Sequence, residues 1–144
     1  MGIEKMIYTG SASTVGLHSD GSPGYEQTPT WPGAAKNLYL KSKEQAERWL
    51  RDFAREKRFF VATALPARMW GPYDFGPTPS GKFVFDAIGH KLPPVLPPGG
   101  SAVVDARDVA VAMLRIAERG RSGEGYILSN GFAEVAAITA SSLL

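Results

Sequence analysis

The chain has 144 residues, 16 Lys and Arg against 14 Asp and Glu, and a formal net charge of +2. This length is typical of one domain, spanning 1–144, that can bury roughly two thirds of its unfolded surface. So small a charge does not indicate nucleic-acid binding, and the lack of cysteine excludes disulfides and thiolate metal sites. No apolar run reaches the roughly 20 residues of a membrane span, and no signal peptide is visible. We therefore expect a cytoplasmic globular protein.

The first predicted element is a strand at residues 5–9, which is short, mostly apolar and expected to be buried. It ends at the turn Gly10-Ser11. The segment 16–32 is rich in Ser, Gly, Pro and Asp, so it is predicted as a loop. His18 and His90 have no second ligand at metal spacing, and we expect both to be solvated, with no metal site.

A long helix is predicted over residues 35–56, because apolar side chains recur on one face and charges fill the other. Its predicted buried stripe contains Tyr39, Lys43, Ala46, Leu50 and Phe53, widened by Leu38 and Trp49. The basic residues between 48 and 58 are predicted to form a solvated face rather than a binding surface.

Strands and helices alternate in the rest of the chain. Residues 59–65 form an apolar run typical of a buried parallel strand, which Pro66 ends. The next predicted elements are a loop at 71–80, a short helix at 81–88, an irregular segment at 91–100 and a short strand at 102–104. A helix follows, which Asp105 caps and Arg119-Gly120 ends, and a last strand is predicted at 126–128. The predicted buried face of this helix consists of Val109, Ala110, Met113, Ile116 and Ala117. This alternation predicts an α/β fold with a parallel sheet of three main strands.

Tyr39 and Lys43 stand four residues apart in the long helix, so their side chains share one helix face. An ammonium beside a phenol favours the phenolate, which makes a tyrosine usable as a general acid or base near neutral pH. Ser11 could hold a substrate oxygen against the same tyrosine. Such a trio suits proton transfer at an oxygen while a nicotinamide cofactor moves a hydride at carbon. The pair alone is a weak signal, because a core tyrosine and a snorkelling lysine give the same pattern.

Five segments carry a resemblance to a known family, and they follow one another in the family's order. They are residues 6–16 with the turn Thr9-Gly10-Ser11, residues 39–47 with the Tyr and Lys pair, and residues 65–74, 103–110 and 123–128. Together they resemble the C-terminal part of the extended short-chain dehydrogenase/reductase family. The resemblance is closer to its dihydroflavonol-reductase-like branch, the NAD-dependent epimerases and dehydratases, and it covers nearly everything from Lys5 to Gly131.

This resemblance implies a fold and a set of roles. The fold would be a partial Rossmann-like parallel sheet with flanking helices. Tyr39 would be the acid/base, Lys43 would assist it and hold the nicotinamide ribose, and Ser11 would orient the oxygen of a small-molecule substrate. Pro66 and Ala67 would lie beside the nicotinamide of NAD or NADP.

The sequence also departs from the family's pattern. The Gly-rich βαβ half that binds the pyrophosphate at a helix N-terminus has no counterpart, and Gly21-Ser22-Pro23-Gly24 neither follows a strand directly nor opens a helix. We therefore expect a single truncated reductase-like domain over 1–144 that binds NAD(P)H weakly or not at all. Gly10 replaces a hydroxyl residue that the family often carries there.

A missing half would leave the strand at 5–9 without its family neighbour. Bare strand edges invite pairing with another chain, so we expect a homo-oligomer, unless the tail 133–144 folds over the edge. Two classes of function stay open. One is an NAD(P)-dependent oxidoreductase or epimerase acting on a carbonyl or secondary alcohol. The other is a non-catalytic remnant or oligomerising module of the same fold.

Overall fold

The structure is a computed structural model that describes residues 2–76, 78–93 and 98–135. The chain groups into two compact units, each with its own three-stranded sheet. The first unit contains Met1–Pro66 and Val109–Leu128, and the second contains Ala67–Asp108 and Ser129–Leu144. No helix within the described ranges is long and apolar enough to cross a bilayer.

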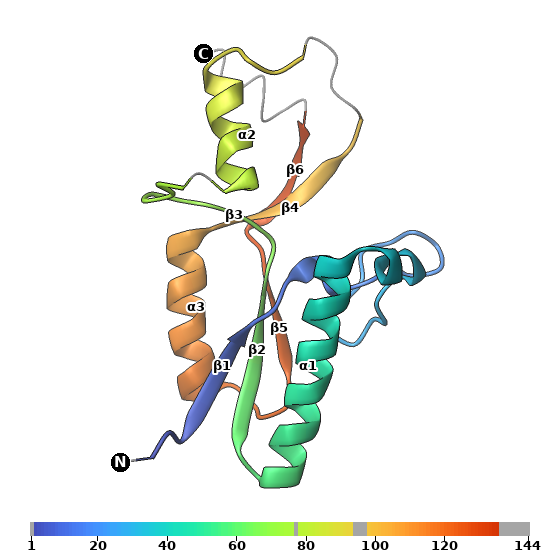
Figure 1. Cartoon of the computed structure of the whole chain (residues 1–144), viewed down its shortest axis with the longest axis vertical. Helices are drawn as coiled ribbons and strands as arrows, with labels where there is room; N and C mark the ends of the chain where they lie inside the picture. Colours follow the sequence, from blue (N-terminus) through green and yellow to red (C-terminus); the bar gives the residue numbers. More distant parts are fainter. Residues whose placement is uncertain (1, 77, 94–97, 136–144) are drawn as a thin grey trace. The chain divides into compact units, whose positions relative to one another are not determined.

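The sheet of the first unit is parallel and has the strand order β1-β2-β5 (Figure 1). Its strands are β1 (Lys5–Thr9), β2 (Phe60–Pro66) and β5 (Gly125–Leu128). The central strand β2 is buried from Val61 to Pro66, which explains the continuous apolar run in the sequence. The predicted α/β class with a parallel sheet is thus confirmed. β1 is not buried as predicted, because it lies at an edge of the sheet and Lys5 and Met6 are exposed.

Helix α1 (Leu38–Lys57) covers one face of this sheet, where Leu50 and Ala54 pack against Val61 of β2. It begins three residues later than predicted, because Asn37 caps it. The Asn37 Oδ1 atom accepts hydrogen bonds from the backbone N–H groups of Tyr39 (3.0 Å) and Leu40 (3.2 Å). A 3₁₀ helix, η2 (Pro32–Lys36), precedes the cap.

The buried face of α1 differs from the predicted stripe. Leu40, Leu50 and Ala54 are buried, whereas Leu38, Tyr39 and Trp49 are 81%, 56% and 63% exposed. The inward face of α1 is therefore rotated from the predicted stripe toward Leu40, and it follows the line of these three residues. Trp49 instead stacks on the half-buried Phe53 from outside, with their ring centroids 5.3 Å apart.

Helix α3 (Ala106–Arg119) packs on the other side of β2, where Ile116 meets Ala62 and Ala64 (Figure 1). Its predicted ends are confirmed. The Asp105 carboxylate accepts a hydrogen bond from the Arg107 N–H (2.8 Å), and the Gly120 N–H bonds back to the Ile116 carbonyl (2.8 Å). Of the predicted buried face, Val109 and Ile116 are buried and Ala110 is exposed.

The second unit holds a mixed sheet in the order β3-β4-β6, in which β3 runs parallel and β6 antiparallel to β4. Its elements are β3 (Arg68–Trp70), α2 (Pro79–Ile88), β4 (Gly100–Asp105) and β6 (Gly131–Glu134). The predictions missed β3 and β6 and gave only the middle of β4. A strand of three or four residues is too short to show the alternation of apolar and polar residues by which strands are predicted. Both strands form here by pairing with β4. Most of the predicted tail, 136–144, lies outside the described residues.

We expect the Asp105 carboxyl in the second unit to titrate with a pKa of about 2. Hydrogen bonds from the Arg107 side chain, and next from its backbone N–H, lower this pKa from the ordinary 3.8. Because the folded pKa lies below the unfolded one, the stability that Asp105 contributes is present above about pH 4 and is lost as the pH falls toward 2. Carboxyl NMR titration measures this, and Arg107→Gln should raise the pKa part of the way back. An unchanged pKa in that variant would contradict the assignment.

Candidate active site

Ser11 lies just beyond the carboxyl end of β1, where the chain enters a short 3₁₀ helix, η1 (Ala12–Thr14). It is only 9% exposed. Its Oγ atom accepts a hydrogen bond from the Ser13 N–H (3.2 Å), and its carbonyl accepts one from the Thr14 hydroxyl (2.7 Å). The Ser11 hydroxyl therefore caps the turn as an acceptor and keeps its own proton to donate to a ligand oxygen.

Gly10 fits this turn because there is no room for a side chain. Its N–H bonds to the Ala64 carbonyl (2.8 Å), and a Cβ atom at Gly10 would lie 2.8 Å from Leu65 Cδ2 and 3.0 Å from Thr63 Cγ2. The neighbouring strand thus accounts for a glycine at this position.

We expect Gly10→Ala to lower the free energy of unfolding by about 1–3 kcal/mol, because the methyl group would overpack a buried contact. Urea denaturation measures the change. Gly2→Ala is the matched control, since a Cβ there meets no atom within 4 Å. Equal stability of the two variants would contradict this explanation.

Lys43 reaches from α1 to the carboxyl end of β1. Its ammonium donates a hydrogen bond to the Thr9 carbonyl (2.9 Å) and lies 5.4 Å from the centroid of the Tyr8 ring. The same ammonium lies 5.9 Å from the centroid of the Tyr39 ring. The spacing of Tyr39 and Lys43 thus brings phenol and ammonium together as predicted from the helix period.

Both side chains keep hydrogen-bonding capacity for a ligand. A lysine ammonium has three donors, and within the described ranges Lys43 uses one of them. Tyr39 is 56% exposed, and its hydroxyl has no partner in that part of the chain. Since η1 contacts α1, the turn at Ser11 lies beside the helix that carries Tyr39 and Lys43.

The remaining predicted site residues, Pro66 and Ala67, lie where β2 ends. Pro66 is buried at the carboxyl end of β2, where it pairs with Leu128 of β5. Ala67 is half-buried and is the first residue of the second unit. Ser11 just beyond β1 and Pro66 at the end of β2 therefore lie at the carboxyl ends of neighbouring parallel strands, which is where open α/β sheets bind ligands.

Sequence reasoning missed the residues that hold this arrangement in place. Asn37 fixes the start of α1 two residues before Tyr39, and an asparagine ahead of a helical pattern was the available signal. The Thr9 carbonyl and the Tyr8 ring hold the Lys43 ammonium. No local sequence pattern predicts these two contacts, because they join residues 34 or more positions apart.

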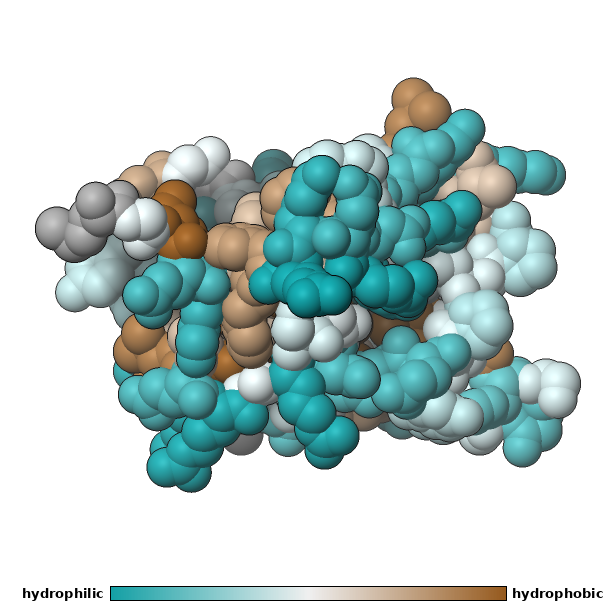
Figure 2. Space-filling model, turned by 90° about the horizontal axis from the view of Figure 1, so that it is seen from below, coloured by the Kyte–Doolittle hydropathy of each residue, from teal (hydrophilic) through white to brown (hydrophobic). Residues whose placement is uncertain are grey.

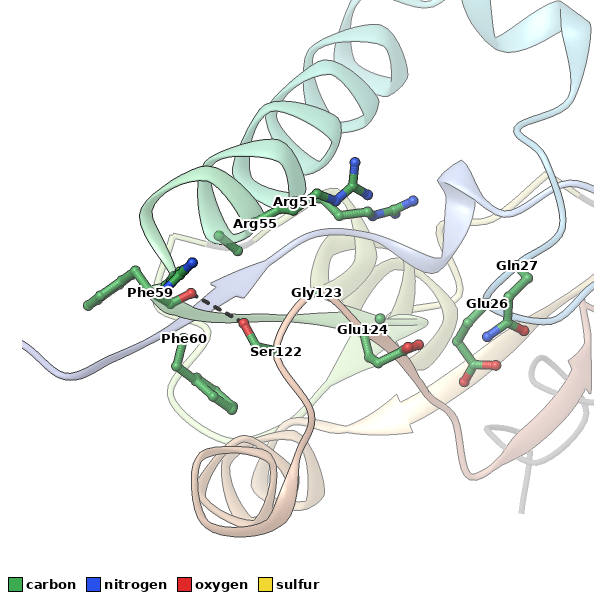
Figure 3. Close-up of a pocket in the computed structure, with 12 residues that line it drawn as sticks. Glu26, Gln27, Arg51, Arg55, Phe59, Phe60, Ser122, Gly123 and Glu124 are labelled. Carbon is green, nitrogen blue, oxygen red and sulfur yellow. Dashed lines mark hydrogen bonds between the residues drawn. The ribbon is translucent and has the colours of Figure 1, made fainter.

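A cleft of about 760 Å³ lies at the other end of the same sheet, beside the amino end of β2 (Figure 3). Arg51 and Arg55 of α1 line one side and Glu124 lines another, while Ser122 donates a hydrogen bond to the Phe59 carbonyl (3.2 Å). Mainly hydrophilic residues cover the molecule in the view from below (Figure 2). We do not assign this cleft to a cofactor, because parallel sheets bind ligands at the carboxyl ends of their strands.

Comparisons with known proteins identify the family. The model of the NAD dependent epimerase/dehydratase family matches residues 1–129. A putative dihydroflavonol 4-reductase from Synechocystis is 29% identical over 133 residues, which cover 90% of this chain and 38% of that protein. The crystal structure of a nucleoside-diphosphate-sugar epimerase from Pseudomonas aeruginosa matches with 27% identity and a TM-score of 0.83, over 97% of this chain and 46% of the other.

A more distant structure shows the fold alone. A dTDP-glucose 4,6-dehydratase from Bacillus anthracis, solved in complex with NAD, has 18% identity and a TM-score of 0.80, and the match covers 96% of this chain and 45% of the other. The chain thus spans less than half the length of these relatives. Its partial Rossmann-like fold is confirmed, and the chain belongs to the NAD-dependent epimerase/dehydratase family.

Proposed function

We propose that the chain carries the acid/base centre of an NAD(P)-dependent oxidoreductase or epimerase that acts on a carbonyl or secondary alcohol. The observation that supports this most is the Lys43 ammonium, which lies 5.9 Å from the Tyr39 ring. It is held there by the carbonyl of Thr9, two residues before Ser11. In this proposal the phenol, the ammonium and the Ser11 hydroxyl act together at the carboxyl end of β1, the end at which open α/β sheets bind ligands.

Each side chain has a part in the proposed reaction. Tyr39 donates its hydroxyl proton to the substrate oxygen, the Lys43 ammonium stabilises the phenolate that forms, and Ser11 donates a hydrogen bond to the same oxygen. When bound, a nicotinamide cofactor would supply the hydride chemistry at the adjacent carbon, in either direction. The two Lys43 donors that no described residue occupies would hold the hydroxyls of a ribose, and Pro66 and Ala67 would hold the nicotinamide.

The relatives support a small-molecule substrate, since they include a putative dihydroflavonol reductase and a nucleoside-diphosphate-sugar epimerase. A cytoplasmic location is part of the proposal, and imaging of a fluorescent fusion would test it.

An NMR titration of the full chain with NADH and with NADPH tests the proposal. We expect weak binding by these 144 residues, with a Kd of about 1 mM, or about −4 kcal/mol, because they contain no Gly-rich pyrophosphate turn. Shift changes should centre on Ser11, Tyr39 and Lys43. Lys43→Met should remove them, and Lys41→Met, an exposed lysine of the same helix, should not. Changes confined to the cleft at Arg51 and Ser122 would contradict the proposal.

A second candidate function is an oligomerising module of the same fold. It is favoured by the position of β1, which has a strand neighbour on one side only within the described ranges. A titration without any shift change at Lys43 would favour this candidate over the first.

A further inference from the structure

The Lys43 ammonium is held in place without a carboxylate. Lys43 is half-buried, and it forms no ion pair with any residue that the structure describes. Glu47 stands four residues later on α1, a spacing at which ion pairs form on a helix, but its carboxylate is paired with Arg51 (2.9 Å). The adjacent Glu44 is paired with Arg48. Both neighbouring carboxylates are thus occupied, and other groups must fix the position of the ammonium.

Two successive residues of β1 supply these groups. The Thr9 carbonyl accepts a hydrogen bond from the Lys43 ammonium (2.9 Å), and the centroid of the Tyr8 ring lies 5.4 Å from the same nitrogen. A cation within about 6 Å of a ring centroid, over the face of the ring, is attracted by the negative charge of that face. The ammonium is therefore fixed by a backbone acceptor and by an aromatic face of the same strand.

The Tyr8 ring is itself anchored in the hydrophobic core. It packs on the α1 side of the sheet against a cluster of buried residues, which are Leu50, Ala54 and Val61. Turning the ring away from Lys43 would also remove it from this cluster. The Tyr8 hydroxyl has no hydrogen-bond partner in the described part of the chain, so the ring rather than the hydroxyl makes the contacts on both sides.

An aromatic face holds a lysine differently from a carboxylate. A carboxylate would cancel the charge of the ammonium and occupy one or more of its three donors. The face of a ring attracts the cation through its quadrupole, carries no net charge and leaves the donors to other acceptors. The proposed acid/base centre needs both of these properties, because the Lys43 charge must stabilise a phenolate at Tyr39 and its free donors must bind a ligand.

We propose that Tyr8 is a positioning residue of this centre, whose ring holds the Lys43 ammonium beside Tyr39. The ammonium lies 5.9 Å from the centroid of the Tyr39 ring, so Lys43 stands between two aromatic side chains. Any residue at position 8 that lacks an aromatic face should leave Lys43 free to turn toward solvent. This inference rests on the proposed function, since it assigns a role to Tyr8 in the same site.

NMR of the full chain without cofactor tests the placement of Lys43. Nuclear Overhauser effects between the Lys43 ε-methylene and the Tyr39 ring should fall by about half or more in Tyr8→Leu, which removes the aromatic face and keeps an apolar side chain. Tyr8→Met is a second variant without a ring and should show the same loss. Tyr8→Phe keeps the ring and should retain the effects. Unchanged effects in Tyr8→Leu and Tyr8→Met would overturn the proposal.

The matched control is Phe53→Leu, which removes another half-buried ring of the same hydrophobic cluster. Phe53 stacks on Trp49, with their ring centroids 5.3 Å apart, so its loss should leave the contact between Lys43 and Tyr39 intact. Urea denaturation of both leucine variants measures the stability that each ring contributes. Equal loss of the Lys43 contact in the two variants would show that Tyr8 acts only through packing, and would overturn the proposal.

A titration with NADPH separates this inference from the proposed function. The Kd for NADPH should rise about threefold or more in Tyr8→Leu and should stay within about twofold of wild type in Tyr8→Phe. Binding at Lys43 that Tyr8→Leu does not weaken would overturn the role of Tyr8 and leave the proposed function standing. A wild-type chain that does not bind NADPH, while Tyr8→Leu still separates Lys43 from Tyr39, would refute the proposed function and support the placement of Lys43 by Tyr8.

Discussion

Under the proposed function, replacing Tyr39 by phenylalanine should lower any reductase activity roughly a hundredfold or more, because it removes the hydroxyl proposed to donate a proton to the substrate oxygen. The rate of NADPH or NADH oxidation with a carbonyl substrate measures the effect. The loss should appear in kcat, since the ring remains in place beside Lys43. An unchanged rate would exclude Tyr39 as the acid.

The structure allows this loss to be separated from a folding defect. Asn37 caps α1 through the backbone N–H of Tyr39, which the substitution retains. The matched control is Tyr25→Phe, because Tyr25 is 53% exposed and Tyr39 is 56% exposed. Tyr25 lies in the loop beside His18, with ring centroids 5.2 Å apart, and its hydroxyl has no role in the proposal. Equal losses in the two variants would point to stability rather than catalysis.

The elements of the first unit were predictable because each carries a local signal. The apolar run of β2 predicts a strand buried on both faces, and Asp105 and Gly120 predict the ends of α3. The strands β3 and β6 were not predictable, because neither is long enough to show a period of two. They exist through pairing with β4, which is a long-range effect that no local window contains.

Part of the candidate site was predictable from local patterns in the sequence, and part was not. The helix period alone places Tyr39 beside Lys43, and the turn after β1 places Ser11 at the end of a strand. The period could not show that Tyr39 is exposed, because an aromatic residue at helical spacing fits a core equally well. The carbonyl that holds Lys43 belongs to β1, so it is fixed by the packing of α1 on the sheet and by no motif.

Leu65→Ala should lower the free energy of unfolding by about 2–5 kcal/mol, because it leaves a cavity in the centre of the sheet. Leu65 is 1% exposed. Its side chain occupies the space beside two glycines, one just after β1 and one at the start of β5. A Cβ at Gly10, the residue after β1, would meet its Cδ2 at 2.8 Å, and one at Gly125 of β5 would meet its Cδ1 at 3.2 Å. Urea denaturation measures the loss.

Leu114→Ala is the control for this variant, because Leu114 is 68% exposed and its truncation should change stability by no more than about 0.5 kcal/mol. The double variant Gly10→Ala with Leu65→Ala tests the packing directly. Once the leucine is shortened, the methyl group at Gly10 has room, so the cost of Gly10→Ala should fall well below its cost in the wild-type chain. Additive losses would mean that Leu65 does not exclude a side chain at Gly10. The turn that positions Ser11 would then owe its glycine to some other contact, such as that with Thr63.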